Sequence, residues 1–373
     1  MPKLQNHGFR SRLTRDKGAA PLYAQVQDLL VEQVHARIMD PEWLLPKEEE
    51  LAKTFGVSQI TVRRAIKELV DARVLQRVKR KGTFVTADYA KRWRDNVGTI
   101  GLVFPHTEFW NTASQAMRSA LRHRGLQPLE MRYHWADTDE EERVLRACLQ
   151  QAAGLIVYPS LNESASSYFR ELKKRRFPFV FFDMRAPTVS APCVRSANAQ
   201  GAAAAARELL DGRFEEYLFL AVQETETTRL RLKGFQNALL EAGYNLPPQN
   251  ILQAGSKTSD VMVREQLHER LRCGKRMGIF AGGVGEARLC YEYALLDSRQ
   301  IPDEIGVVGF DDFAEAPLLN PPLTVIRQDQ MALAHAAVTL LSRMVEGLPT
   351  SSLIEIPTEL VRRASVRSAV AAL

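Results

Sequence analysis

The chain has 373 residues, of which 45% are hydrophobic and 25% charged, and this balance excludes an intrinsically disordered protein. No apolar run approaches the ~20 residues that a membrane span needs, and no signal peptide opens the sequence, so we expect a cytoplasmic protein of two or three domains. The net charge of +6 is uneven, because residues 1–94 carry 19 Lys and Arg against 11 Asp and Glu, whereas the remainder carries 31 against 33. We therefore expect a polyanionic partner to bind the basic N-terminal segment, residues 1–94.

Residues 1–20 are basic and show no apolar period, so they are predicted to form a disordered tail. The cations of this tail are either only solvated or add a phosphate contact. Residues 21–86 are predicted to form a compact domain whose first helix opens at Pro21. This helix is expected to bury Leu22, Val26, Leu29, Leu30 and Ile38.

The sequence next predicts two short helices joined by a tight turn. The first, Glu48–Phe55, is amphipathic, and Gly56 ends it because glycine tolerates a positive φ. Ser58 is expected to cap the second helix by accepting a hydrogen bond from a backbone N–H. The apolar side of this second helix consists of Val62, Ala65, Ile66, Leu69 and Val70.

The other side of the second helix is polar. It carries Gln59, Arg63 and Lys67 at i, i+4 and i+8, with Thr61 and Arg64 beside them. A charged helix face is by itself usually only a solvated surface. The preceding helix, the glycine turn and the segment that follows favour a face that reads base edges in a DNA groove.

That following segment is predicted to be a basic hairpin. Its strands are Leu75–Val78 and Thr83–Val85, and its tip is Lys79-Arg80-Lys81-Gly82. Adjacent cations repel one another unless an anion lies near, and a phosphate backbone or a minor groove is the expected anion. The whole segment is thus predicted to be a winged helix-turn-helix.

The residues of this domain resemble the DNA-binding domain of the GntR family of bacterial transcription regulators. The resemblance rests on Leu45-Pro46, Glu48, Leu51-Ala52, Gly56-Val57-Ser58, Thr61-Val62-Arg63, Ala65, Leu69 and Gly82-Thr83-Phe84-Val85. It implies contacts with double-stranded operator DNA through Lys47, Ser58, Gln59, Thr61, Arg63, Arg64, Lys67, Lys79, Arg80, Lys81 and Gly82. The family usually has Ser at position 47 and Arg at position 59. Since Gln reads adenine where Arg reads guanine, the operator sequence cannot be taken from relatives.

A linker is predicted at residues 87–97, and beyond it apolar strands alternate with helices. The strands are expected at Thr99–Phe104, Gly154–Tyr158, Phe179–Phe182, Tyr217–Val222, Met277–Ala281 and Ile305–Phe310. The helices are expected at Thr112–Arg124, Glu140–Gln151, Ala199–Leu210, Leu230–Ala242, Val261–Leu271 and Glu286–Leu296. This alternation predicts a doubly wound α/β fold with a parallel sheet, and its length indicates two lobes.

Ligands of such folds bind outside the carboxyl ends of the strands. Phe109 and Trp110 follow the first strand, Asp183 follows Phe179–Phe182, and Asp311 follows Ile305–Phe310. Aromatic rings and carboxylates from separate strand ends suit a small polyhydroxylated ligand. The alternatives are a solvated or capping role for the two aspartates and core packing for the two aromatic residues.

Residues 98–366 resemble the effector domain of LacI-type repressors, which is related to periplasmic sugar-binding proteins. The resemblance rests on Gly98-Thr99-Ile100-Gly101, Phe182-Asp183, Arg231-Leu232-Lys233-Gly234-Phe235, Val307-Val308-Gly309-Phe310-Asp311-Asp312, Pro322-Leu323-Thr324-Val325-Ile326 and Glu359-Leu360-Val361-Arg362-Arg363-Ala364-Ser365. It implies a first lobe at about 98–195 plus 329–352, a second at about 196–328 plus 353–366, and a tail at 367–373. It also implies effector contacts at Asp183, Arg231, Asp311 and Gln328.

One departure from this family is large. Gly282-Gly283 stands where the family usually has Asn-Asp, and Glu286 and Arg288 are the candidates to substitute. Gly283-x-Gly285 also resembles part of a dinucleotide fingerprint, but Arg288 occupies the place of the third glycine. The four cysteines and seven histidines show no metal-ligand spacing. We therefore expect no cofactor and no metal.

This combination of two domains resembles that of arabinose-repressor-like regulators. The resulting hypothesis is a homodimeric DNA-binding repressor on a palindromic operator, controlled by a small polar metabolite bound between the lobes. A transporter's solute-binding protein would share the body but would need a signal peptide and no DNA-binding head. An enzyme would need a nucleophile-base pair, a metal cluster or a complete cofactor loop, and the sequence displays none of them.

Overall fold

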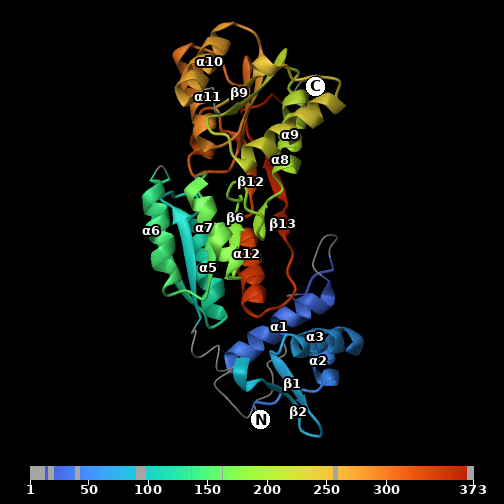
Figure 1. The fold of residues 1–373 in the computed structure, drawn as a ribbon. Coiled ribbons are helices and arrows are strands. Elements are labelled where there is room, and N and C mark those ends of the chain that lie inside the picture. Colours follow the sequence, from blue (N-terminus) through green and yellow to red (C-terminus); the bar gives the residue numbers. More distant parts are fainter. Residues whose placement is uncertain are drawn as a thin grey trace. The chain divides into compact units, whose positions relative to one another are not determined.

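The computed structural model describes residues 13–15, 21–37, 43–89, 98–135, 137–161, 163–254 and 259–367. The chain divides into two compact units, which we call the first and the second unit (Figure 1). The first unit consists of Met1–Phe182, Ala186–Pro192 and Ala334–Ser352, and the second of Asp183–Arg185, Cys193–Leu333 and Leu353–Leu373. Within the described ranges, no helix is both long and apolar enough to cross a membrane.

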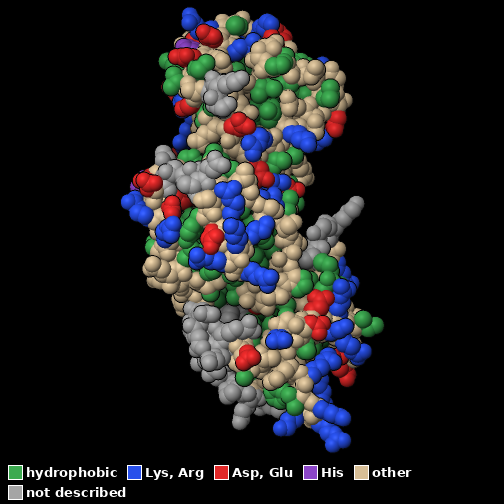
Figure 2. Space-filling view, in the orientation of Figure 1, with side chains coloured by type: hydrophobic (Ala, Val, Ile, Leu, Met, Phe, Trp, Pro, Cys, Tyr) green, Lys and Arg blue, Asp and Glu red, His purple; other side chains and the backbone are tan. Residues whose placement is uncertain are grey.

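The N-terminal part of the first unit, called the head, is the predicted winged helix-turn-helix. It consists of α1 (Leu22–Arg37), α2 (Glu48–Phe55), α3 (Gln59–Asp71), β1 (Leu75–Val78) and β2 (Gly82–Val85). Its buried core includes Val26, Leu30, Leu51, Phe55, Val62, Ile66, Leu69 and Leu75. Lys and Arg side chains gather at the end of the head that carries the β1–β2 hairpin (Figure 2).

Local signals set the helix ends in the head as predicted. Gly56 ends α2 with a left-handed backbone at φ 69°, and its N–H donates to the Ala52 carbonyl. Ser58 caps α3 and its Oγ accepts from the Thr61 N–H at 3.2 Å. Lys47 stands at the cap of α2 without a side-chain capping bond in the described chain. Leu22 and Val70 are only half-buried, and Ile38 lies outside the described residues.

The head is larger than the sequence predicted at both ends. Residues 87–89, assigned to the linker, are helical, and Tyr89 is buried in the head's core because its ring adds apolar area there. Leu13 packs against the same core, and Gln25 bonds both the N–H and the carbonyl of Thr14 at 2.9 Å. The prediction of a disordered tail is therefore wrong for residues 13–15. Residues 1–12, 16–20 and 90–97 of the predicted tail and linker lie outside the described ranges.

The first six-stranded sheet has the order β13-β7-β6-β5-β3-β4. These strands are β3 (Thr99–Pro105), β4 (Gln127–Tyr133), β5 (Gly154–Val157), β6 (Phe179–Phe182), β7 (Cys193–Ser196) and β13 (Leu353–Ile356). The pairs β3–β4, β3–β5, β5–β6 and β7–β13 are parallel. The helices of this region are α5 (Asn111–His123), α6 (Thr138–Leu149) and α7 (Glu163–Lys174).

The second six-stranded sheet has the order β14-β12-β11-β10-β8-β9. It is parallel apart from the antiparallel pair β12–β14. The strands are β8 (Glu216–Ala221), β9 (Ile251–Gln253), β10 (Met277–Ala281), β11 (Ile305–Phe310), β12 (Thr324–Gln328) and β14 (Thr358–Val361). The helices of this region are α8 (Asn198–Asp211), α9 (Glu226–Glu241), α10 (Asp260–Arg272) and α11 (Val284–Leu296), with 3₁₀ turns at Pro248–Asn250 and Ala316–Leu318. The last helix, α12 (Gln330–Val345), begins in the second unit, and from Ala334 onward it belongs to the first.

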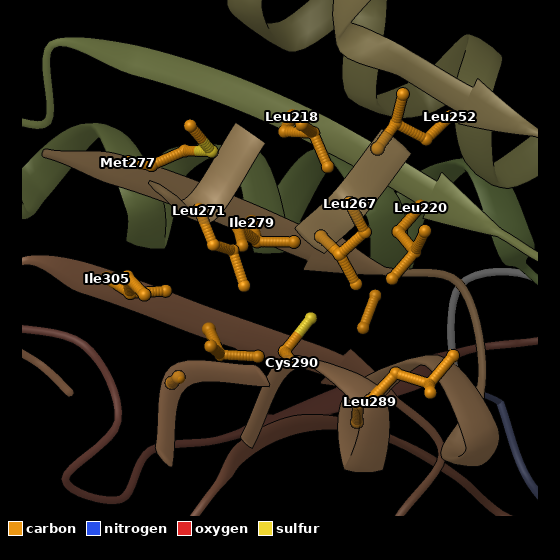
Figure 3. Close-up of a cluster of buried hydrophobic side chains, with 14 of the residues drawn as sticks. Leu218, Leu220, Leu252, Leu267, Leu271, Met277, Ile279, Leu289, Cys290 and Ile305 are labelled. Carbon is orange, nitrogen blue, oxygen red and sulfur yellow. The ribbon is translucent and has the colours of Figure 1, made fainter. Parts of the chain in front are cut away.

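Helices cover both faces of the second sheet, and an apolar core lies on each face. On one face, α10 and α11 contribute Leu267, Leu271 and Cys290 to a core with Leu218 and Ile279 (Figure 3). On the other face, α8 and α9 pack closely because Gly234 has no side chain. A Cβ there would lie 2.2 Å from the Ala199 carbonyl oxygen. This packing fixes α9, whose first turns carry polar residues discussed below.

The last helix links the body of the first unit to the head. Near the end of α12, Arg343 donates to Asp28 at 2.9 Å and to Gln27 at 3.2 Å, both on α1. Leu348, just beyond α12, is buried in the head's core. The described part of the first unit therefore has a direct contact between α12 and the head.

Candidate functional site

The exposed face of α3 is the first candidate site. Gln59, Arg63 and Lys67 are exposed along it, and the buried residues of the helix lie on the opposite side. Thr61 is half-buried and its Oγ1 lies 2.8 Å from Ser58 Oγ, so both hydroxyls are already engaged at the helix start. This arrangement offers long amide and guanidinium side chains to a groove, which is what base readout requires.

An acidic residue holds two of the arginines in place. Glu48 accepts from Arg63 Nε at 3.0 Å and from Arg77 Nη2 at 2.8 Å, and so connects α2, α3 and β1. Arg64 stacks 3.7 Å above the Tyr23 ring and lies 3.3 Å from Glu68. The sequence reasoning did not name Arg77, because its partner Glu48 lies 29 residues away in the sequence.

The hairpin tip is exposed and cationic. Lys79, Arg80 and Lys81 are exposed between β1 and β2, and Gly82 takes a φ of 121° that side chains rarely adopt. A Cβ on Gly82 would lie 2.4 Å from Leu44 Cδ1, so the turn needs glycine for space as well. Lys47 is also exposed, at the start of α2. The predicted DNA contacts thus lie on one helix, one helix start and one hairpin of the head.

The second candidate site is a cluster of buried polar side chains in the second unit, which we call the polar cluster. Its two aspartates are each the first residue after a strand: Asp183 after β6 and Asp311 after β11. Both have left-handed backbones, with φ of 68° and 85°, and both are at least nine-tenths buried. Such conformations cost free energy in non-glycine residues and are found at functional sites.

Asp311 is held by two neighbours. Its carboxylate accepts from Gln328 Nε2 at 2.5 Å and lies 3.9 Å from Arg231 Nη1. Gln328 in turn accepts from the Ser196 hydroxyl. Burial raises the pKa of Asp311, and the nearby Arg231 charge and the Gln328 bond act in the opposite direction.

Arg231 on α9 is the cation of the polar cluster. It donates to Asn198 Oδ1 at 2.8 Å and to the Gly282 carbonyl at 2.6 Å, and its guanidinium lies 3.6 Å from the centre of the Phe310 ring. Only 5% of this residue is exposed. The planar guanidinium is thus fixed by hydrogen bonds at its edge and by an aromatic face.

Asp183 is the residue of the polar cluster that lacks a partner. Its backbone N–H donates to the Val194 carbonyl at 2.8 Å, but its buried Oδ1 has no hydrogen-bond partner among the described residues. Burial raises the pKa of Asp183 to about 7, with Arg231 lowering it and Asp311 raising it further. A buried carboxylate oxygen without a donor is costly, and a ligand hydroxyl would supply the missing bond.

The structure distinguishes the two candidates to substitute for the missing Asn-Asp. Glu286 is buried, accepts from the Val222 N–H at 2.9 Å, and would lie 2.9 Å from a Cβ on Gly283. Burial raises the pKa of Glu286, and Arg231 and Asp311 are both close enough to affect it. Arg288 is half-exposed and pairs with Glu315 at 3.1 Å. Glu286 therefore belongs to the polar cluster.

The two aromatic candidates belong to the first unit. Trp110 is 4% exposed and packs edge-to-face on Phe182 at 5.0 Å and on Phe109 at 4.7 Å. The ring centre of Tyr158 lies 6.1 Å from that of Trp110. Trp110 is thus a core residue, as the alternative interpretation held, whereas Phe109 is half-buried. Their predicted contact with an effector remains a prediction.

Sequence reasoning missed several residues that support the polar cluster. Ser196 is the last residue of β7, a strand that the sequence did not predict, and Asn198 is the first residue of α8. Glu226, at the start of α9, accepts from Arg195 at 2.6 Å and from the Arg185 N–H at 2.8 Å. Arg195 also donates to Glu355 at 3.0 Å. The polar run Arg195-Ser196 in a buried strand was the available signal.

Comparisons with known proteins identify the two kinds of domain in the chain. Residues 22–85 match the model of bacterial regulatory proteins of the gntR family, and residues 206–366 match that of the periplasmic binding protein-like domain. The chain is 25% identical over 341 residues to the arabinose metabolism transcriptional repressor of Geobacillus stearothermophilus. That alignment covers 87% of this chain and 92% of the relative.

Solved structures share the fold of the body. The transcription regulator CcpA of Lactococcus lactis is similar with a TM-score of 0.64 and 18% identity, covering 72% of this chain and 99% of that one. A periplasmic binding protein/LacI transcriptional regulator from Alkaliphilus metalliredigens, complexed with D-xylulofuranose, is similar with a TM-score of 0.60 and 21% identity, covering 72% and 99%. The predicted fold class is confirmed. The chain is a DNA-binding transcription regulator in which a gntR-type winged helix-turn-helix precedes a periplasmic binding protein-like domain.

Proposed function

We propose that the protein is a repressor whose affinity for its operator is controlled by a neutral polyhydroxylated metabolite, a sugar or a sugar-like compound, bound at the polar cluster. The observation that carries the proposal is the buried Asp183 oxygen without a donor beside Arg231 and Asp311. The relative from Geobacillus stearothermophilus is named for arabinose metabolism, and a related fold holds D-xylulofuranose. Both support a sugar-class effector.

The charges of the polar cluster favour a neutral ligand. Asp183, Asp311 and Glu286 lie near the buried guanidinium of Arg231. The other buried guanidinium that affects Asp183, that of Arg195, is already bonded to Glu226 and Glu355. Carboxylates accept hydrogen bonds and repel anions, so hydroxyl donors suit them better than a phosphate or a carboxylate would. Glu286 here supplies the carboxylate that Gly283 lacks. A neutral sugar is therefore favoured over a sugar acid or a sugar phosphate.

The connection to DNA is proposed to pass through α12. This helix begins two residues after Gln328, and its other end bonds α1 of the head through Arg343. An effector that prefers one arrangement of Gln328 and Asp311 would thereby shift the head's conformational equilibrium. A homodimer would place two α3 helices in successive major grooves of a palindromic operator.

A screen by thermal shift tests the effector class. Neutral sugars and polyols should contain a compound that raises the unfolding temperature, since a ligand at 100 times its Kd stabilises by about 2.7 kcal/mol. The same compound should change affinity for an operator obtained by in vitro selection from random duplexes. Stabilisation by sugar phosphates or sugar acids, with none by neutral sugars, would contradict the proposal.

Substitutions in the head should separate base readout from phosphate contact. Gln59→Ala and Arg63→Ala should each reduce discrimination between the selected operator and random DNA by about 1–3 kcal/mol. Lys81→Ala should weaken binding to both DNAs equally and lower the salt slope by about 1. Fluorescence anisotropy across a salt series measures both quantities. Arg175→Ala, which removes an exposed cation just beyond α7, is the control. Unchanged discrimination in the first two variants would refute the assignment of α3.

A further inference from the structure

We propose that the first unit binds one divalent transition-metal ion between His106, His134 and Glu140. One ligand atom from each residue lies within 4.8 Å of the ligand atoms of the other two. Both histidines are exposed and Glu140 is half-buried, so an ion can reach them from solvent. This site lies outside the polar cluster and outside the DNA-binding face.

The fold brings the two imidazoles together. β3 and β4 are parallel neighbours with Pro105 opposite Tyr133, so the next residue of each strand is also a neighbour. The His106 N–H donates to the Tyr133 carbonyl at 2.8 Å, which continues the pairing. The ring centres of His106 and His134 are 4.5 Å apart, with 40° between their planes. Two imidazoles at this separation can share one ion.

Glu140 orients one of these imidazoles. It lies in the first turn of α6, where its own N–H donates to the capping Asp137 at 2.8 Å. Its Oε2 accepts from the His134 N–H at 2.6 Å and lies 2.8 Å from His134 Nδ1. Since a carboxylate only accepts, Nδ1 carries the proton and the lone pair is on Nε2. A carboxylate bonded to the far nitrogen is the usual support of a metal-binding histidine.

The donor set indicates the class of ion. Imidazole nitrogens and a carboxylate oxygen suit Zn²⁺, Ni²⁺ and Cu²⁺, whereas Mg²⁺ and Ca²⁺ prefer oxygen alone. Glu140 either remains the orienting group or turns its carboxylate to the ion as a third ligand, and in both cases open positions remain for water. The site also lies at the carboxyl ends of β3 and β4, the edge at which doubly wound sheets bind ligands.

Short sequence motifs cannot show this site. His106 and His134 are separated by a helix and a strand, and they become neighbours only through the β3–β4 pairing. The prediction of no metal rested on the absence of close spacings, and it did not consider residues that follow adjacent parallel strands.

Metal titration of the tag-free, full-length protein tests the proposal. The protein is treated with EDTA, and its exposed thiols are alkylated because Cys273 is exposed and would compete. Zn²⁺ is titrated by calorimetry, and Co²⁺ by its visible absorption. We expect one equivalent to bind with a micromolar or lower Kd. His106→Ala and His134→Ala should each raise the Kd at least 100-fold, and Glu140→Gln should raise it about 10–100-fold.

The matched control is His268→Ala in the second unit. His268 also contacts a carboxylate, Asp297 at 3.1 Å, but its ring stacks on Tyr293 and not on a second histidine. Its removal should leave the Kd unchanged. Because His106 and His134 are exposed, their variants should keep the unfolding temperature of the apo protein, and His106→Gln and His134→Gln serve if an alanine variant does not fold. A Kd above a millimolar, or a Kd that neither histidine substitution changes, would overturn the proposal.

Discussion

Replacing Arg231 with methionine should lower the free energy of unfolding by about 3–5 kcal/mol, although the new side chain has a similar reach. Arg231 is almost fully buried and bonds Asn198 and the Gly282 carbonyl, and its charge lies 3.9 Å from Asp311. Its loss would leave a buried carboxylate without a counter-charge. Differential scanning calorimetry at pH 8 measures the effect.

The control for this variant is Arg229→Met, two residues earlier on the same helix. Arg229 is 59% exposed and pairs with Glu224 at 3.4 Å, so its removal should cost under 1 kcal/mol. Arg231→Met should also abolish the stabilisation by any effector found in the screen, while the head keeps its affinity for DNA. Equal losses of stability in the two variants would show that Arg231 does not compensate the polar cluster.

Replacing Asp183 with asparagine should stabilise the protein at pH 8 by up to ~4 kcal/mol. This figure is the difference between the folded-state and unfolded-state pKa of Asp183, converted at ~1.4 kcal/mol for each pKa unit. The folded-state pKa of Asp183 is raised from 3.8 to about 7. Between these values the folded chain keeps a proton that the unfolded chain has lost. Stability therefore falls as pH rises from about 4 to about 7, and it levels off above.

Asparagine tests this cleanly because it tolerates the positive φ at position 183 and cannot ionise. Unfolding by calorimetry from pH 4 to pH 8 should show a smaller decline in stability for Asp183→Asn than for the parent protein. Asp139→Asn, an exposed acid in the first turn of α6, should leave the decline as it is. If both variants follow the parent's pH dependence, Asp183 is not the group that ionises.

Most interior strands could be predicted from the sequence, whereas the edge strands and the short interior strands β7 and β12 could not. Every body strand predicted from a continuous apolar run is present, with ends shifted by one residue at most. The missed strands include β4 and β9, each at the edge of its sheet, and the short β7. β4 has only half-buried residues along most of its length, so its sequence carries no apolar run. Edge strands pair through backbone groups, which leave little trace in the side chains.

Site residues could be predicted from the sequence where they directly follow a strand that could itself be predicted. Asp183 and Asp311 were found because they stand directly after β6 and β11. The resemblance also implied Gln328, which bonds Asp311. Ser196, which bonds Gln328, and Asn198, which bonds Arg231, were not predictable because they are distant from their partners in sequence. The choice of Glu286 over Arg288 needed the burial of one and the exposure of the other, which depend on how α11 rotates against its sheet.

The second unit can complete its sheet only late in synthesis, because residues near position 365 bond strands that precede them in the chain. Its sheet closes with β14, and Ser365 then donates to the Val307 carbonyl at 2.6 Å and accepts from the Thr324 N–H at 2.8 Å. These partners lie about forty to sixty residues earlier in the chain. Because synthesis runs from the N-terminus, β11 and β12 can form these bonds only after residue 365 has left the ribosome. A chain truncated before residue 358 would lack β14 and should therefore be a substrate for chaperones and proteases.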